Sequence, residues 1–180
     1  EKLSISFERV EYAKNNFIRV VKVMKAFILN DSVKSFLCLN NKLPQENKGL
    51  FDIKLLEEFA DAIIKIYGIK GLKGKDLLYS INSEDYDAKR AEFIQRLSKG
   101  EKLFVISSYN TVGAGQNLQY KAPGNATIVA VNDYDRGDME KDFDCIYLEK
   151  PTNLLVNVDS KKGIEAEDLI RFVYQMEFLM

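Results

Sequence analysis

The 180-residue sequence contains no histidine. This absence excludes imidazole general bases, histidine metal sites, and Ser-His-Asp or Cys-His catalytic groups. The other residues offer no general base or metal ligand set that we can assign, so we expect no catalytic residue and no metal site. Cysteine is scarce, and Cys38 and Cys145 lie far apart in apolar runs. That placement favours free thiols in a reducing cytosol over a disulfide.

Long apolar runs and an excess of one charge are also absent. No stretch approaches the ~20 residues that a membrane helix needs, and there is no signal peptide, so we expect a cytoplasmic chain without a membrane partner. With 26 Lys and Arg against 27 Asp and Glu, the net charge of −1 gives no sign of nucleic-acid binding. The chain begins at Glu1 and ends within an apolar helical pattern at Met180, and we expect a fragment of a longer protein.

The spacing of apolar residues predicts an α/β fold. Amphipathic helices are predicted over residues 7–29, over 52–67 with Asp52 as N-cap, from Ser83 or Asp85 to Leu97, and from about residue 165. Short apolar runs predict strands over 35–39, 77–81, 102–107, 127–131 and 145–148. Such alternation is typical of a mostly parallel sheet with helices on both faces. We predict a helical extension over 1–32 and one domain over 33–180, with an insertion over 120–141.

The segment Gly68–Asp76 (GIKGLKGKD) resembles a phosphate loop only superficially. A Walker A loop needs glycine five places before its Gly-Lys pair and a hydroxyl after it, but Ile69 and Asp76 stand there. The segment also follows a predicted helix and leads into a strand, which is the wrong order. We interpret it as a glycine turn with solvated lysines, so we expect no ATP binding by a phosphate loop in this chain.

Residues 103–119 (LFVISSYNTVGAGQNLQ) carry the strongest functional pattern. A predicted strand ends in Ser107 and Ser108 and leads to Thr111 and then to a Gly-x-Gly-x-Asn-Leu run. Ligands gather at the carboxyl ends of strands in an open α/β sheet. Glycines allow close approach of a backbone, and hydroxyls and bare N–H groups are good phosphate donors. A structural glycine turn is the alternative.

This segment resembles motif V of superfamily-two helicases, especially the version in remodeller-like members. The resemblance implies a second RecA-like domain in which Ser108, Thr111 and Gly113 face the nucleic-acid backbone. It also implies that Gly115 and Asn117 face the nucleotide. DEAD-box members have Asp where this chain has Asn117, and Thr111 has no fixed counterpart.

The flanking sequence is similar to the same family over about residues 33–157. Arg90 and Gly100 occupy recognisable places, whereas we interpret Phe93 as a core residue. The strand at 145–148 is followed by Glu149, Lys150 and Thr152, which we expect at the sheet edge that holds Asn117; a structural role is the alternative for all three. The arginine-rich motif VI is missing, and the six arginines are Arg9, Arg19, Arg90, Arg96, Arg136 and Arg171. We expect that motif beyond Met180, with Arg171 and Gln175 as a degenerate version otherwise.

The resemblance implies the second motor lobe of an ATP-dependent helicase or translocase. Its partners would be DNA or RNA and a first RecA-like lobe on the same parent chain. That first lobe would make most of the contacts to ATP and Mg²⁺. The isolated chain should neither hydrolyse ATP nor bind it tightly. Two other functions stay open: a non-catalytic helicase-like scaffold or protein-binding domain, and a small-molecule enzyme such as a methyltransferase. The second would need its glycine loop after the first strand and an acidic residue about twenty residues later.

Overall fold

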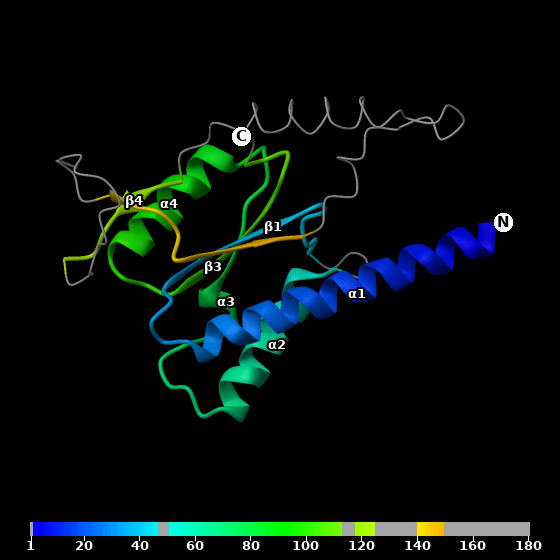
Figure 1. The fold of residues 1–180 in the computed structure, drawn as a ribbon, viewed down its shortest axis with the longest axis horizontal. Coiled ribbons are helices and arrows are strands. Elements are labelled where there is room, and N and C mark those ends of the chain that lie inside the picture. The colour runs from blue at the N-terminus through cyan, green and yellow to red at the C-terminus, as the bar shows by residue number, and fades with distance from the viewer. Residues whose placement is uncertain (1, 47–50, 113–117, 125–139, 150–180) are drawn as a thin grey trace, which may run out of the picture. The chain divides into compact units, whose positions relative to one another are not determined.

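The computed structural model describes residues 2–46, 51–112, 118–124 and 140–149 (Figure 1). All of these residues belong to one compact unit, Glu1–Glu149; the second unit is Lys150–Met180, which lies outside the described residues.

Four parallel strands form the central sheet, in the order β2-β3-β1-β6. They are β1 (Ser35–Asn40), β2 (Leu78–Ser80), β3 (Leu103–Ser108) and β6 (Cys145–Leu148). Each lies within one residue of a predicted strand, except that Leu77 closes a helical turn because its amide donates to the Lys73 carbonyl. A mixed α/β fold with a parallel sheet is therefore confirmed, while its RecA-like character stays a prediction.

In the described part of the chain, four helices flank the sheet. They are α1 (Lys2–Leu29), α2 (Ile53–Ile66), the short α3 (Gly74–Leu77) and α4 (Tyr86–Ser98). Asp52 is the N-cap of α2 as predicted, since its carboxylate accepts from the Lys54 amide at 2.8 Å. Asp85 stands at the N-cap of α4 but makes no capping bond there; instead, the Asn82 side chain accepts from the amides of Glu84 and Asp85.

The core lies on both faces of the sheet because side chains alternate along each strand. Phe36 of β1 and Phe104 of β3 point to the face that α1, α2 and α3 cover, and their rings stack with centroids 5.0 Å apart. Leu37 and Val105 point to the opposite face, where α4 packs through Phe93 and Leu97. Phe93 is fully buried, which confirms its predicted place in the core.

Helix α1 packs against the sheet through its C-terminal half. Val20, Met24 and Ile28 have no exposed surface and share one apolar cluster with α2 and the sheet. The N-terminal half extends past the sheet (Figure 1), and Phe7 is 71% exposed. The predicted boundary at residue 32 stays a prediction, but half of α1 belongs to the core of the α/β unit.

A second, two-stranded sheet brings the ends of the segment 120–141 together. Its strands are β4 (Tyr120–Lys121) and β5 (Glu140–Lys141), which pair antiparallel. The chain thus leaves and returns at one place, as an insertion requires. Residues 125–139, which include the predicted strand 127–131, lie outside the described residues, as does the predicted helix from about residue 165.

Candidate functional site at the carboxyl edge of the sheet

The carboxyl ends of the four parallel strands share one edge of the sheet. From β1 the chain crosses through α2 toward β2, whereas from β3 it leads to β6 on the other side of β1. The connections that follow the neighbouring strands β1 and β3 therefore run in opposite directions. In an open α/β sheet such a topological switch point opens a crevice at the strand ends, where ligands bind.

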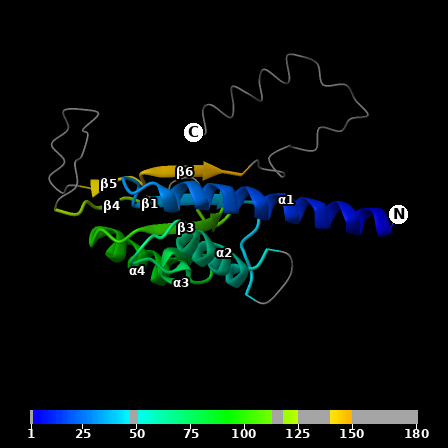
Figure 2. The same cartoon turned by 90° about the horizontal axis from the view of Figure 1, so that it is seen from below.

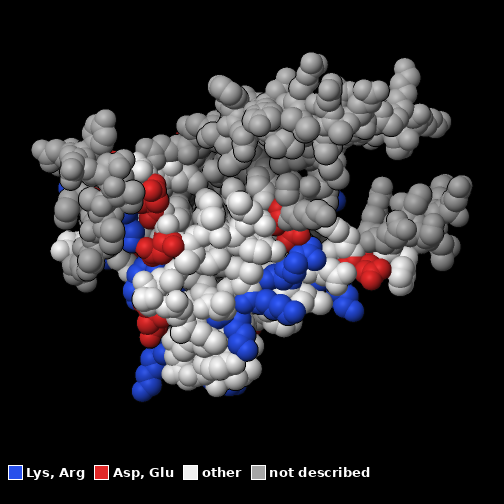
Figure 3. Space-filling view, in the orientation of Figure 1, with Lys and Arg blue, Asp and Glu red and all other residues white. Residues whose placement is uncertain are grey.

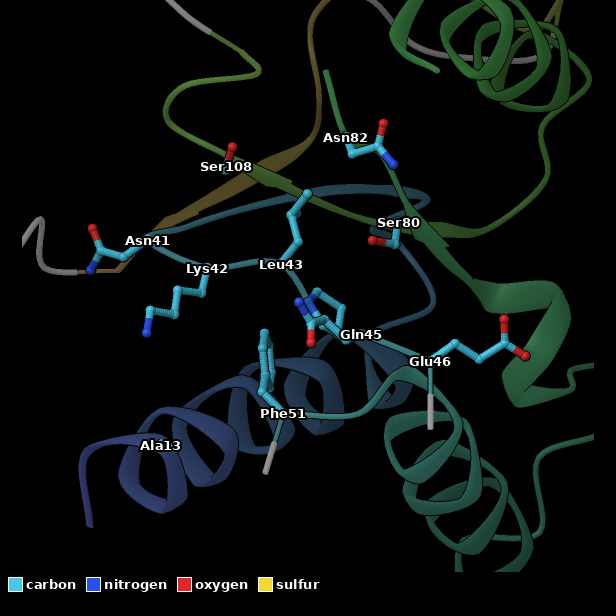
Figure 4. Close-up of a pocket in the computed structure, with 11 residues that line it drawn as sticks. Ala13, Asn41, Lys42, Leu43, Gln45, Glu46, Phe51, Ser80, Asn82 and Ser108 are labelled. Atoms are coloured by element: carbon cyan, nitrogen blue, oxygen red, sulfur yellow. The ribbon is translucent and has the colours of Figure 1, made fainter. Parts of the chain in front are cut away.

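A pocket of about 930 Å³ lies at this edge (Figure 4). The loop between β1 and α2 forms one side, and the ends of β2 and β3 form the other. Its polar side chains are mostly amides and hydroxyls, with one lysine and one carboxylate. The lining residues are Ala13, Asn41, Lys42, Leu43, Pro44, Gln45, Glu46, Phe51, Ser80, Asn82 and Ser108.

The loop after β1 begins with two anchored asparagines. Asn40 is buried; its side-chain amide donates to the Asn16 carbonyl oxygen at 3.1 Å, and its own carbonyl oxygen accepts from the Asn41 amide at 2.8 Å. The Asn41 side chain in turn donates to the Tyr12 hydroxyl at 3.2 Å. These bonds fix the start of the loop to α1, and Lys42 follows with its side chain exposed.

Ser108 stands opposite Asn40 at the end of β3 and lines the pocket. Its hydroxyl lies 2.9 Å from the Thr111 hydroxyl and accepts from the Thr111 amide at 3.2 Å, while its carbonyl accepts from the amides of Thr111 and Val112. Two of the three predicted nucleic-acid contacts, Ser108 and Thr111, are thus brought together in one turn. Ser108 also satisfies that turn's own backbone, which supports the structural alternative beside the functional one.

Glu149 follows β6 at the same edge and is 3% exposed. Arg19 of α1 holds its carboxylate through two bonds of 2.6 and 3.0 Å, and the Tyr147 hydroxyl donates to it at 2.7 Å. The Tyr109 hydroxyl donates to the Glu149 carbonyl at 2.6 Å. Burial, together with the bond to Glu149, raises the pKa of Tyr147 to about 12. Glu149 therefore ties α1, β3 and β6 together, which favours the structural role left open for it.

Three predicted ligand contacts cannot be placed. Gly113, Gly115 and Asn117 lie outside the described residues, as do Lys150 and Thr152. The superficial phosphate loop lies between α2 and β2, far along the chain from these positions, and Gly68 and Gly71 have φ angles of 65° and 80°. Such left-handed angles are typical of glycine turns, in agreement with our interpretation of that segment.

Sequence reasoning missed the other side of the pocket. Asn41 and Lys42 follow β1 directly, and Asn82 follows β2 after one residue. Polar residues just after two predicted strands were the available signal, because parallel strands place such positions on one edge. Neither the Asn41-Lys42 pair nor Asn82 belongs to a recognisable sequence motif, so these residues do not stand out until the order of the strands is known.

The described part of the chain contains no group of three or more His, Cys, Asp or Glu side chains that could hold a metal ion. None of its helices combines the length and hydrophobicity needed to cross a bilayer. Within the same residues both cysteines are free thiols, and burial raises the pKa of Cys38 to about 12. No protein-family model matches the chain, and a search of curated proteins found no match to it.

Proposed function

We propose that this chain is the second motor lobe of an ATP-dependent helicase or nucleic-acid translocase, and that a single strand of DNA or RNA passes over the pocket at the carboxyl edge. One observation carries the proposal. Ser108, which belongs to the segment that resembles motif V, lies on the wall of the pocket at the topological switch point. The motif-like segment in the sequence and the pocket in the structure thus lie at the same edge of the sheet.

The lining of the pocket suits a sugar-phosphate backbone. Lys42 supplies a positive charge, Asn82 an amide, and Ser80 and Ser108 hydroxyls, all of which are common donors to phosphate oxygens. Among the described residues that line the pocket, Glu46 is the one carboxylate. Such contacts position a strand without reading its bases, so the expected binding is independent of sequence.

The nucleotide would be held mainly by a first lobe that carries the phosphate loop absent here. Gly115 and Asn117, which lie outside the described residues, are the positions proposed to face the nucleotide in this lobe. ATP and Mg²⁺ would supply the hydrolysis that drives strand movement, and this chain's share is to hold the strand. The alternative of a non-catalytic helicase-like domain retains the same pocket.

The test is a titration of the chain with a fluorescently labelled single strand at low salt, followed by fluorescence anisotropy. Lys42→Ala should lower the affinity about five- to thirty-fold, because one charge-assisted phosphate contact contributes about 1–2 kcal/mol. Lys70→Ala is the matched control, since Lys70 is an equally exposed lysine in the Gly68–Asp76 loop. Loss of affinity should be the same for strands of different sequence.

Two outcomes would contradict the proposal. One is the absence of measurable strand binding to the unaltered chain at low salt. The other is an equal loss in both lysine variants, which would indicate diffuse electrostatic attraction instead of a strand path over the pocket.

A further inference from the structure

Helices α1 and α2 leave an apolar seam open on the outer surface of the unit. Ile18 of α1 is 38% exposed, and Leu55, Phe59 and Ile66 of α2 are 40%, 42% and 76% exposed. Tyr67, at the C-terminus of α2, is 50% exposed. Scattered apolar side chains are ordinary on a surface, but a contiguous row marks an interaction site.

The row is contiguous because α1 and α2 run side by side in the same direction. Phe17 contacts Phe59 with ring centroids 5.4 Å apart, and the Lys25 ammonium lies 5.1 Å from the Tyr67 ring. Each of these pairs is 42 positions apart in the sequence, so residues 17–25 of α1 lie along residues 59–67 of α2. Figures 1 and 2 show the two helices adjacent in both views.

The exposed residues of α2 form a helical stripe. Leu55, Phe59, Ala62 and Ile66 follow the spacing i, i+4, i+7 and i+11, and all four are exposed. At 1.5 Å per residue the stripe is about 16 Å long, or roughly three turns. Its inner neighbours Leu56, Ala60 and Ile63 are buried in the core, so α2 packs on the unit mainly through a different face.

The α1 side of the seam is positively charged. From Tyr12 to Asn30 the helix carries Lys14, Arg19, Lys22 and Lys25 and no acidic residue. Arg19 is engaged with Glu149, but the three lysines are exposed. Basic side chains gather over this face of the molecule (Figure 3).

Two of the three acidic residues of α2, Glu57 and Asp61, lie away from this charge, while the third, Glu58, is exposed. Asp61 accepts from the Gly74 amide at 2.7 Å, and a Cβ at Gly74 would lie 2.3 Å from the Glu57 carbonyl oxygen. The Glu57–Asp61 side of α2 therefore faces α3, away from α1.

We propose that this seam binds an amphipathic helix of a partner protein, with the apolar face of that helix on Leu55, Phe59 and Ile66 and acidic residues beside Lys14, Lys22 and Lys25. An amphipathic helix binds by laying its own apolar face on an exposed apolar surface of its receptor. The charge on α1 selects an acidic partner. Leu55 and Ile66 offer a base neither a ring to stack on nor a hydrogen-bond donor, so a nucleic acid would leave these two anchors uncovered. This proposal goes beyond the motor function and does not depend on it.

The probe is a synthetic helical peptide of about 15 residues with Leu at i, i+4, i+7 and i+11 and Glu on both flanks. It should bind the chain with a roughly micromolar dissociation constant in fluorescence anisotropy. Phe59→Asp and Ile66→Asp should each weaken binding at least tenfold. A peptide with Lys in place of every Glu should bind at least tenfold more weakly, and higher salt should narrow this difference.

Phe7→Asp is the matched control. Phe7 is 71% exposed on the same helix as Ile18, but it precedes the seam by about two turns, so binding should be unchanged. All substituted side chains are exposed, and thermal melting verifies that each variant is folded. The proposal is overturned if the acidic peptide does not bind, if the charge-inverted peptide binds equally well, or if Phe59→Asp and Phe7→Asp behave alike. The proposal is also overturned if the chain binds a nucleic-acid single strand or anionic vesicles instead of the peptide, and Phe59→Asp abolishes that binding.

Discussion

The amino edge and the carboxyl edge of the parallel sheet differ in the partners of their polar groups. At the amino edge, the carboxylate of Asp144 accepts from the amides of Lys34 and Ser35 at 2.8 and 2.9 Å and from the Lys141 ammonium at 2.5 Å. The Ser35 hydroxyl accepts from the Asp144 amide and from the Tyr120 hydroxyl, both at 2.8 Å. These bonds close the edge with partners from within the chain.

A buried lysine completes the amino edge. Lys102 donates to the carbonyls of Ile28 and Asn30 at 3.2 and 2.7 Å, and its ammonium lies 4.8 Å from the Phe27 ring. It thus satisfies carbonyls that the end of α1 leaves without helical partners. Burial lowers the pKa of this ammonium.

The carboxyl edge instead surrounds an open pocket. Its loop is anchored through Asn40 and its strand end through Glu149, but Lys42 and the side chains of Ser80 and Asn82 line the space between them. Substitutions at the amino edge should therefore cost stability, whereas substitutions in the pocket should cost ligand binding.

The largest effect is expected for Asp144→Ala. The change removes three acceptor bonds and leaves the Ser35 amide, in a fully buried residue, without its partner, so the free energy of unfolding should fall by about 3 kcal/mol. Urea denaturation measures it. Asp142→Ala is the matched control, since that exposed carboxylate accepts one bond from Gln119. An equal effect of both variants, or a loss of strand binding in Asp144→Ala at unchanged stability, would contradict the comparison.

The same residue predicts a pH dependence. Burial alone would raise the pKa of Asp144, but the bonds from Lys141, Ser35 and Lys34 outweigh it and lower the pKa below 3.8. Its contribution is therefore complete above about pH 4 and is lost as the pH falls through the lower, folded-state pKa. In Asp144→Asn the decline of the melting temperature between about pH 4 and pH 2 should be shallower than in the unaltered chain. An unchanged slope would contradict this assignment.

Arg19→Leu changes a residue at the carboxyl edge that should contribute to stability and not to ligand binding, as the residues of the amino edge do. Removal of Arg19 leaves the Glu149 charge buried, and unfolding should become easier by about 2–3 kcal/mol. This loss is smaller than the roughly 3–5 kcal/mol that is typical when a buried ion pair loses one partner. The reason is that the Arg19 side chain is 41% exposed. Strand affinity should stay unchanged. Addition of Glu149→Gln should recover part of the loss in a double-mutant cycle; no recovery would show that the two residues are not coupled.

Two lysines at opposite edges give the most direct contrast. Lys102→Met keeps the length of the side chain but removes both carbonyl bonds, and should cost about 2 kcal/mol. Lys42→Ala should change stability by less than about 0.5 kcal/mol, since Lys42 is exposed, while it lowers strand affinity. Thermal melting beside strand titration separates the two effects. A reversed order of stabilities would break the comparison.

A smaller stability effect than that of Lys102→Met is expected for Ser108→Ala. Loss of its bonds to Thr111 should cost about 1 kcal/mol, and loss of a phosphate contact should lower strand affinity about five-fold or more. Ser108→Thr retains the hydroxyl and should restore both properties. A variant with lower stability and unchanged strand affinity would assign Ser108 to the turn alone.

The elements with strong local patterns were predictable. The strand at Cys145–Leu148 and the N-cap at Asp52 agree with the prediction, because an apolar run and a capping carboxylate act within a few residues. Helix α4 starts at its N-cap Asp85, one of the two predicted positions, but the Asn82 side chain accepts the free amides there. For the candidate site, Ser108 and Thr111 were named from the sequence, whereas Asn41 and Asn82 became visible only when the strands were in order.

A parallel sheet that is covered by helices on both faces was predictable from the sequence alone. Continuous apolar runs in β1 and β3 require cover on both sides, and helical spacing in α1, α2 and α4 provides it. The strand order was decided only by the tertiary structure, since Asn40 and Ser108 are 68 positions apart and face each other in register. The same holds for Arg19 and Glu149, 130 positions apart, and for the parallel packing of α1 on α2. Apolar burial and paired charges at long range select these contacts, and neither leaves a local pattern in the sequence.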